Sequence, residues 1–145
     1  MKKLNSLKQT PTLLAFIKTL FALEKVKIKK DIEKTLMLHS RCRCGEKHCA
    51  TVTLKKKTPW NRRKENSFHI FDVNKGTVWI HFLKKGYCEI EAIGYEDFPY
   101  KDEVDKLFRS SGTLHPKINT RKLNNYFKNC KNDKGNRIDL GELNL

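Results

Sequence analysis

Two glycine-containing loops divide residues 67–95 into three segments of alternating apolar and polar residues, and this pattern constrains the fold more than any other feature of the chain. The segments Ser67–Val73, Thr77–Leu83 and Tyr87–Tyr95 predict three strands, because successive side chains of a strand point to opposite faces of a sheet. The connections 74–76 and 84–86 each have the length and the glycine of a three-residue hairpin loop. We therefore expect an antiparallel meander.

The alternation assigns every side chain of the meander to one of two faces. One face is apolar and is expected to lie under the N-terminal helix: it carries Phe68, Ile70, Val78, Ile80, Phe82, Cys88, Ile90 and Ala92. The other face carries aromatic and ionisable side chains, which we take as candidate partner-binding residues: His69, Phe71, Trp79, His81, Tyr87, Glu89 and Glu91.

The polar face supports more than one interpretation. Three-residue loops would pair Val73 with Thr77 and Leu83 with Tyr87. They would thus form two cross-strand rows, namely His69 with His81 and Glu89, and Phe71 with Trp79 and Glu91. The first row suits acid–base cleavage of RNA or metal binding, although exposed sheet faces often carry such residues. Aromatic residues beside charges are typical of protein interfaces, but a C-terminal helix covering this face fits the sequence equally well.

Helical periodicity occurs on both sides of the meander. Thr10 and Pro11 suit an N-cap and a first helical turn, and apolar residues then recur at helical spacing over residues 11–25. Residues 26–35 fit either a continuation of this helix or a strand. Ala50–Leu54 fits a short strand.

The C-terminal third predicts two more helices. Residues 102–109 begin with acidic and end with basic side chains, the order that a helix dipole favours, and residues 120–130 carry an apolar stripe. The chain is therefore expected to be a single α+β domain over residues 1–145. It would have an antiparallel sheet of four to five strands, an N-terminal helix on one face, one or two C-terminal helices, and a loose tail over 131–145.

The net charge of +15 is concentrated in the first half of the chain. Residues 1–64 hold 18 Lys and Arg against 4 Asp and Glu, whereas residues 65–145 hold 13 against 12. Such a field speeds encounters with an anionic partner, be it nucleic acid, a membrane surface or an acidic protein. No segment approaches the roughly 18 apolar residues of a membrane helix, and no small-residue cleavage site follows the N-terminal apolar stretch. We expect a cytoplasmic protein.

The segment 55–64 interleaves basic residues with one tryptophan. Cations for phosphates beside an aromatic ring for base stacking are the elements of an RNA or single-stranded DNA site, here Lys55, Lys56, Lys57, Trp60, Arg62, Arg63 and Lys64. A solvated excursion between two strands would have the same composition.

Three of the five cysteines, Cys42, Cys44 and Cys49, lie within eight positions around a glycine. An odd number of crowded cysteines suits reduced thiols or a metal better than disulfides. Thiolates at this spacing can surround one zinc ion of structural role, with Cys88, His39 or His48 as the fourth ligand. The alternative is a turn with partly buried thiols.

The run RCRCGEKHCAT, residues 41–51, enters a strand and, with the meander, resembles small bacterial immunity proteins encoded beside polymorphic and contact-dependent growth inhibition toxins. The resemblance covers residues 36–98. It implies a protein that binds the C-terminal domain of a toxin in the cytosol and blocks its active site or target surface. Immunity proteins against nucleases are typically acidic. For this basic chain the resemblance therefore implies a toxin with an acidic surface, or a basic segment outside the interface.

The sequence contains no P-loop, no dinucleotide-binding glycine pattern and no nucleophile elbow. We therefore expect a protein without enzymatic activity whose partner is a protein toxin. The sequence indicates no small-molecule substrate. A nucleic-acid-binding module, with or without a stabilising zinc ion, is the alternative.

Overall fold

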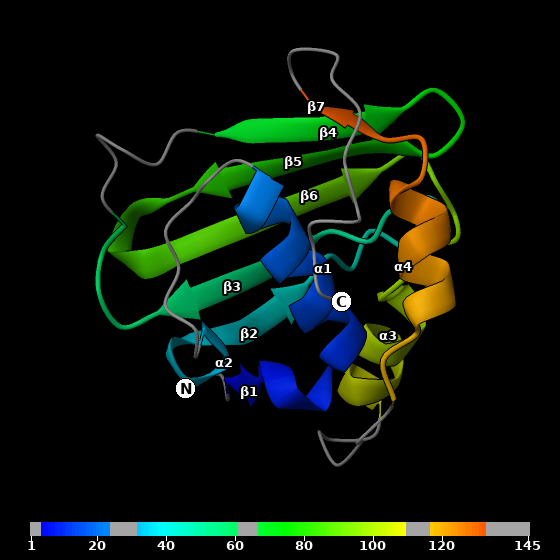
Figure 1. Ribbon diagram of the computed structural model, residues 1–145. Helices are drawn as coiled ribbons and strands as arrows, with labels where there is room; N and C mark the ends of the chain where they lie inside the picture. The colour runs from blue at the N-terminus through cyan, green and yellow to red at the C-terminus, as the bar shows by residue number, and fades with distance from the viewer. Residues whose placement is uncertain (1–3, 24–31, 61–66, 110–116, 133–145) are drawn as a thin grey trace.

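The computed structural model describes residues 4–23, 32–60, 67–109 and 117–132, and these residues form an α+β fold (Figure 1). The strands are β1 (Asn5–Ser6), β2 (Leu36–Arg41), β3 (Val52–Lys56), β4 (Phe68–Asp72), β5 (Gly76–Phe82), β6 (Tyr87–Ile93) and β7 (Lys131–Asn132). The helices are α1 (Pro11–Leu23), α2 (Ile32–Thr35), α3 (Lys101–Arg109) and α4 (Thr120–Phe127), with short 3-10 turns at Leu7–Gln9 and Lys84–Gly86.

The strands form one antiparallel sheet in the order β1-β2-β3-β6-β5-β4-β7. The α+β class and the meander β4-β5-β6 are therefore confirmed. The expected four to five strands were too few, because β2 was not predicted and two-residue strands flank the sheet at β1 and β7. In the undecided segment 26–35, residues 32–35 form α2 and the rest lies outside the described residues.

The first hairpin has a different register from the one expected. Asp72 pairs with Gly76, so the loop is Val73–Lys75 and the glycine begins the next strand. The carboxylate of Asp72 accepts the N–H of Asn74 at 2.7 Å, and its carbonyl accepts the N–H of Lys75 at 3.0 Å, which closes the turn one residue early. Gly76 has φ +75°, and a Cβ there would lie 2.1 Å from the carbonyl oxygen of Ile93. The second hairpin has the expected register.

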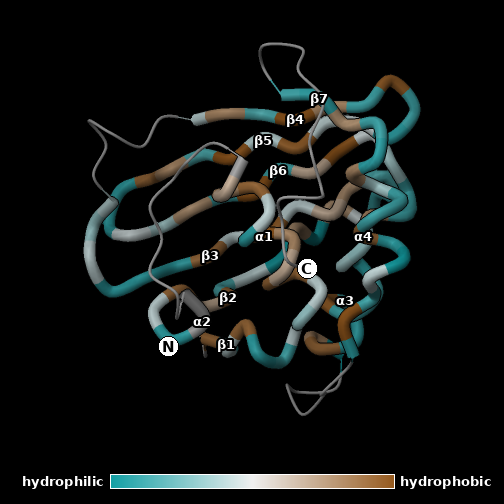
Figure 2. The backbone as a smooth tube through the Cα atoms, in the orientation of Figure 1, coloured by the Kyte–Doolittle hydropathy of each residue, from teal (hydrophilic) through white to brown (hydrophobic). Residues whose placement is uncertain are grey.

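The division of the meander into two faces is confirmed. All eight residues of the expected core face are at most 4% exposed, and Figure 2 shows brown and pale segments alternating along these strands. Helix α1 crosses this face (Figure 1) and buries Leu13, Phe16, Ile17, Leu20 and Phe21. The ring of Phe16 also contacts Tyr100, Tyr126 and Phe127, with centroids 5.0, 5.5 and 5.0 Å away. One core thus joins the sheet, α1 and α4.

The N-terminus of α1 is capped from a distant element. Thr10 occupies the expected cap position, since its carbonyl accepts the N–H of Leu14 at 2.9 Å, but its hydroxyl donates to Leu7. The side chain that accepts a first-turn N–H is Glu103 of α3, whose Oε1 lies 2.9 Å from the amide nitrogen of Leu13. Burial raises the pKa of Glu103 to about 7, although the hydrogen bonds from Leu13 and Thr12 act in the opposite direction.

The C-terminal helices form close to the expected positions. Helix α3 has its acidic residues in the first turn and its basic residues in the last, and α4 buries Leu123, Tyr126 and Phe127. Lys131 and Asn132, expected in a loose tail, pair with β4, while 133–145 lies outside the described residues. In the described part of the chain, no helix is long and apolar enough to cross a bilayer.

Candidate functional site: the open sheet face and the three-cysteine loop

The sheet face opposite α1 carries all seven of the expected partner-binding side chains, and none of them is buried by the described residues. Trp79 is 36% exposed and the other six are half-buried. We call this surface the open face. Its residues come from β4, β5 and β6, whose other side chains point into the core.

Four rings form a nearly parallel series on the open face. The rings of Phe71 and His69 have centroids 5.5 Å apart at 21°, those of His69 and Trp79 lie 4.1 Å apart at 16°, and those of Trp79 and His81 lie 6.1 Å apart at 6°. We call these four residues the aromatic ladder. Burial lowers the pKa of His69, which favours its neutral form within the ladder.

The observed register changes the expected rows. His81 pairs with Glu89 and Trp79 with Glu91, as expected, but His69 lies opposite Trp79 and Phe71 opposite Thr77. The row of two histidines with a carboxylate is therefore wrong, because the earlier closure of the first turn moves His69 along β5. A ribonuclease site built on adjacent imidazoles does not form.

Two carboxylates lie next to the aromatic ladder. Nε2 of His81 is 3.4 Å from Oε1 of Glu91, and potential ligand atoms of His81, Glu89 and Glu91 all lie within 4.8 Å of one another. Among the described residues, no Lys or Arg forms an ion pair with either glutamate. Two lysines lie at the margins of this face: Nζ of Lys55 in β3 is 4.8 Å from the ring centroid of Tyr87, and Lys131 in β7 pairs with Phe71.

The described part of the basic segment, residues 55–60, differs from the expected nucleic-acid site. Lys55 and Lys56 belong to β3, and the Trp60 ring is only 6% exposed. It packs against Phe82 with centroids 4.8 Å apart, and Nζ of Lys56 lies 3.9 Å from its centroid. A ring packed in this way is not available for base stacking. Lys57 is exposed, whereas Arg62, Arg63 and Lys64 lie outside the described residues.

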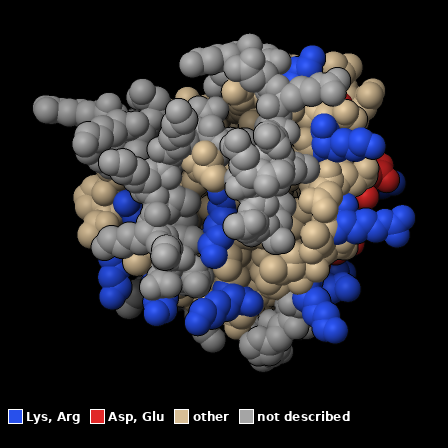
Figure 3. Space-filling model, viewed as in Figure 1, with Lys and Arg blue, Asp and Glu red and all other residues tan. Residues whose placement is uncertain are grey.

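Figure 3 shows the helix-bearing side of the molecule, where Lys and Arg side chains are scattered over the described surface and Asp and Glu appear near one edge. On this side the described basic residues do not gather into one continuous groove. On the sheet, Lys55 of β3 pairs with Tyr87 and Lys131 of β7 pairs with Phe71, so two lysines lie at the margins of the open face.

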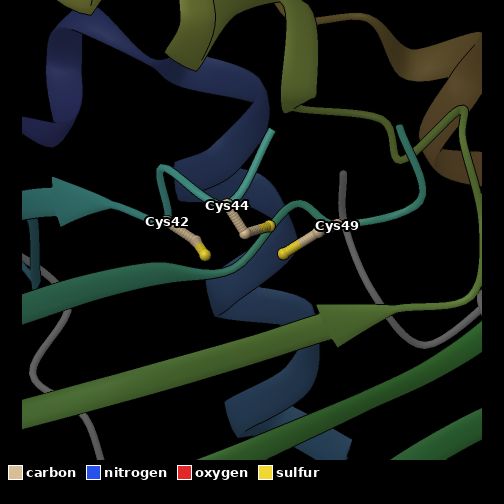
Figure 4. A group of neighbouring side chains, drawn as sticks. All are labelled: Cys42, Cys44 and Cys49. Atoms are coloured by element: carbon tan, nitrogen blue, oxygen red, sulfur yellow. The ribbon is translucent and has the colours of Figure 1, made fainter. Parts of the chain in front are cut away.

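The connection between β2 and β3 brings three thiols together (Figure 4). The sulfur atoms of Cys42, Cys44 and Cys49 lie within 4.8 Å of one another, and those of Cys44 and Cys49 point toward each other. Gly45, with φ +78°, turns the chain back between them. The N–H of Cys42 donates to the carbonyl of Thr51 at 2.8 Å and so anchors the loop on β3. We call residues 42–49 the three-cysteine loop.

The thiols of Cys42 and Cys44 differ in acidity. The amide of Glu46, and then the thiols of Cys42 and Cys49, form hydrogen bonds that lower the pKa of Cys44. For Cys42, a hydrogen bond from the amide of Cys44 lowers the pKa, but the Cys44 thiol, burial and Cys49 together outweigh it, so that its pKa is raised. Of these two thiols, the exposed Cys44 therefore takes up negative charge first.

None of the expected fourth ligands joins the three thiols. Cys88 is fully buried in the core, where it pairs with Leu54 and Phe82 across the sheet. The ring of His39 contacts Tyr87, with centroids 5.3 Å apart. His48 is exposed within the loop, and its carbonyl accepts the N–H of Gly94. The described residues thus offer a possible metal site of three thiols.

A small pocket of about 20 Å³ adjoins the three-cysteine loop. Cys42 and Cys49 line it together with Arg41, Lys101 and Asp105, and α3 closes its far side. Arg41 forms an ion pair with Asp105, and Nζ of Lys101 donates to the carbonyl of Lys47. The contact of Lys101 with the loop spans 54 residues and could not be predicted from the local sequence.

Comparison with known proteins gave no similarity: no family model, curated protein or solved structure matches this chain.

Proposed function

We propose that this protein is an immunity protein that binds a bacterial toxin domain through the open face and thereby neutralises it. The observation that carries the proposal is the aromatic ladder, four nearly parallel rings on a sheet face that no described helix covers. Exposed apolar surface of this kind marks interaction sites, and tryptophan dominates the energetics of many protein interfaces. The resemblance of residues 41–51 to immunity proteins supports a toxin as the partner.

The charges of the open face favour a partner with a cationic contact surface. Glu91 lies opposite Trp79 and Glu89 lies opposite His81, and Nε2 of His81 is 3.4 Å from Oε1 of Glu91. An Arg or Lys of the partner can lie over an indole face and pair with a carboxylate at the same time. Under this proposal the basic residues elsewhere in the chain lie outside the interface. This is the second of the two possibilities that the resemblance implied.

We expect Trp79→Ala to weaken toxin binding by at least about 2 kcal/mol, a roughly 30-fold rise in Kd, because the central ring of the ladder is lost. The measurement is isothermal titration calorimetry against the C-terminal domain of the toxin that the proposal expects to be encoded beside this gene. Ile118→Ala is the control, since Ile118 is an apolar residue, 50% exposed, that lies outside the sheet. Equal affinities of the two variants would contradict the proposed interface.

Nucleic-acid binding is the second candidate, and the net charge of +15 favours it. The burial of Trp60 and the two carboxylates of the open face count against a stacking platform on the described residues. Fluorescence anisotropy with labelled tRNA separates the two candidates, because a nonspecific field loses its affinity as the salt concentration rises. Submicromolar binding at physiological salt would favour this candidate.

We also propose that the three-cysteine loop holds one zinc ion, which fixes the connection between β2 and β3. The support is the proximity of three sulfur atoms, the ligands that zinc prefers in structural sites. Arg41, Arg43 and Lys47 flank the thiols in the sequence and offset the negative charge of a zinc ion bound to three thiolates.

We expect zinc at a hundredfold excess over its Kd to raise the free energy of unfolding by about 2.7 kcal/mol, because the ion binds only the folded loop. Cys44→Ser removes one ligand and should abolish this gain. Cys88→Ala should keep the gain, since Cys88 lies in the core. The measurement is thermal unfolding with zinc and with a chelator. A wild-type Tm that is the same with zinc and with the chelator would contradict this site. A gain that is lost in Cys88→Ala but kept in Cys44→Ser would also contradict it.

A further inference from the structure

We propose that the ion at the three-cysteine loop keeps one coordination position for an exchangeable ligand from solvent, a water or a small anion, in the pocket between the thiols and α3. The inference rests on the metal binding proposed above and goes beyond it, because it assigns to the site a ligand that the described residues do not supply. A structural zinc with four protein ligands is closed, whereas three protein ligands leave a position for water or another small molecule.

The number of protein ligands is the first argument. In the parts of the chain that the structure describes, only Cys42, Cys44 and Cys49 bring ligand atoms within 4.8 Å of one another at this loop. Cys88, the expected fourth ligand, is fully buried on the core side of β6. Zinc prefers four donors, so the fourth donor must come from outside this set.

The pocket supplies the second argument. Its volume of about 20 Å³ exceeds the roughly 10–15 Å³ that one water needs. Two of the three cysteines line it, so a ligand in the pocket lies beside the metal position. The hydroxyl of Tyr100, which also lines it, already donates to the carbonyl of Ala50 at 2.6 Å. The space is therefore suited to one monodentate ligand.

The charge around the pocket is the third argument. A divalent ion with three thiolates carries a net charge of −1, and an anionic fourth ligand would make it −2. Arg41, Lys101 and Asp105 line the pocket, and Asp105 pairs with Arg41, so the three together carry a net charge of +1. Arg41 and Lys101 can offset the charge of the site through hydrogen bonds to the ligand. Arg43 belongs to the same loop but does not line the pocket, so the two arginines can be compared directly.

Cobalt(II) is the probe ion for the test, because its visible bands respond to each ligand, and azide is the probe anion. We expect the cobalt-loaded protein to shift its bands saturably as azide is added. Arg41→Gln should weaken azide binding roughly tenfold through loss of a charge-assisted hydrogen bond, with cobalt affinity retained. Lys101→Gln provides a second variant if loss of the Arg41–Asp105 ion pair prevents folding. Arg43→Gln should bind azide as wild type does.

Cobalt bands that do not respond to azide would overturn the inference. If His48→Ala then changed those bands, the fourth position would belong to the chain itself. A wild-type protein that develops no cobalt bands would overturn the metal site as well, and so distinguishes failure of the zinc proposal from failure of the open position.

Discussion

Trp60→Ala should lower the free energy of unfolding by about 3–5 kcal/mol, the usual cost of removing a large aromatic side chain from a core. The ring is 6% exposed and contacts Phe21 and Phe82, with centroids 6.3 and 4.8 Å away. Its substitution removes these contacts and leaves a cavity beneath the ammonium group of Lys56. Urea denaturation of wild type and variant gives the difference directly.

Trp79→Ala is the matched control, because it removes the same side chain from the open face. We expect it to cost less stability than Trp60→Ala, since Trp79 is 36% exposed. Trp60→Ala should therefore cause the larger loss of stability, and Trp79→Ala the larger loss of toxin binding. A Trp60→Ala protein with unchanged stability and reduced affinity for tRNA would contradict this packing and favour the nucleic-acid candidate.

Glu103→Gln should remove a pH dependence of stability worth about 3 kcal/mol. Burial raises the pKa of Glu103 from 4.5 to about 7 in the folded protein. The folded state thus binds a proton that the unfolded state has released between these values. The contribution of Glu103 to stability is full below about pH 4.5 and is lost as the pH rises through about 7. Glutamine can still accept the N–H of Leu13 but does not titrate.

The measurement is the free energy of unfolding of wild type and Glu103→Gln by urea denaturation between pH 4.5 and 8.5. The difference between them should move in favour of the variant as the pH rises. Glu96→Gln is the control, because Glu96 is an exposed carboxylate that precedes α3 and should show no such trend. A constant difference between wild type and Glu103→Gln would show that Glu103 titrates normally in the folded protein.

The meander and its two faces were predictable from the sequence because they follow from short-range alternation. Phe68, Val78 and Ile90 all reach the core as their positions in the pattern require. Strand β2 was missed because its alternation is short: Leu36 and Leu38 point inward, and the register with β3 shifts between Leu38 and Ser40.

The register of the first hairpin was predicted wrongly because the loop was assigned from its glycine alone. Gly76 suggested a loop ending at that residue, whereas the turn is closed by Asp72 through its side chain and carbonyl. The sequence Asp72-Val-Asn74 contains this signal, since Asp favours a turn that bonds the amide two residues on. A shift of one residue on each strand kept every side chain on its predicted face but separated His69 from His81.

The candidate sites were predictable in their local parts and not in their long-range contacts. The spacing of Cys42, Cys44 and Cys49 was sufficient to predict that they meet. Cys88 was a poor fourth ligand from the start, because the alternation that makes Ile90 a core residue also turns Cys88 inward. The cap that Glu103 provides for Leu13, across 90 residues, requires the tertiary structure.

The central claim is that the open face binds and neutralises a toxin domain, and growth on co-expression tests it most directly. The toxin domain that the proposal expects to be encoded beside this gene is expressed with wild type, with Trp79→Ala, or with the exposed-site control Ile118→Ala. The account predicts that wild type and Ile118→Ala restore growth and co-purify with the toxin, whereas Trp79→Ala does neither while remaining folded. Failure of the wild-type protein to protect cells or form a complex would contradict the account, as would full protection by Trp79→Ala.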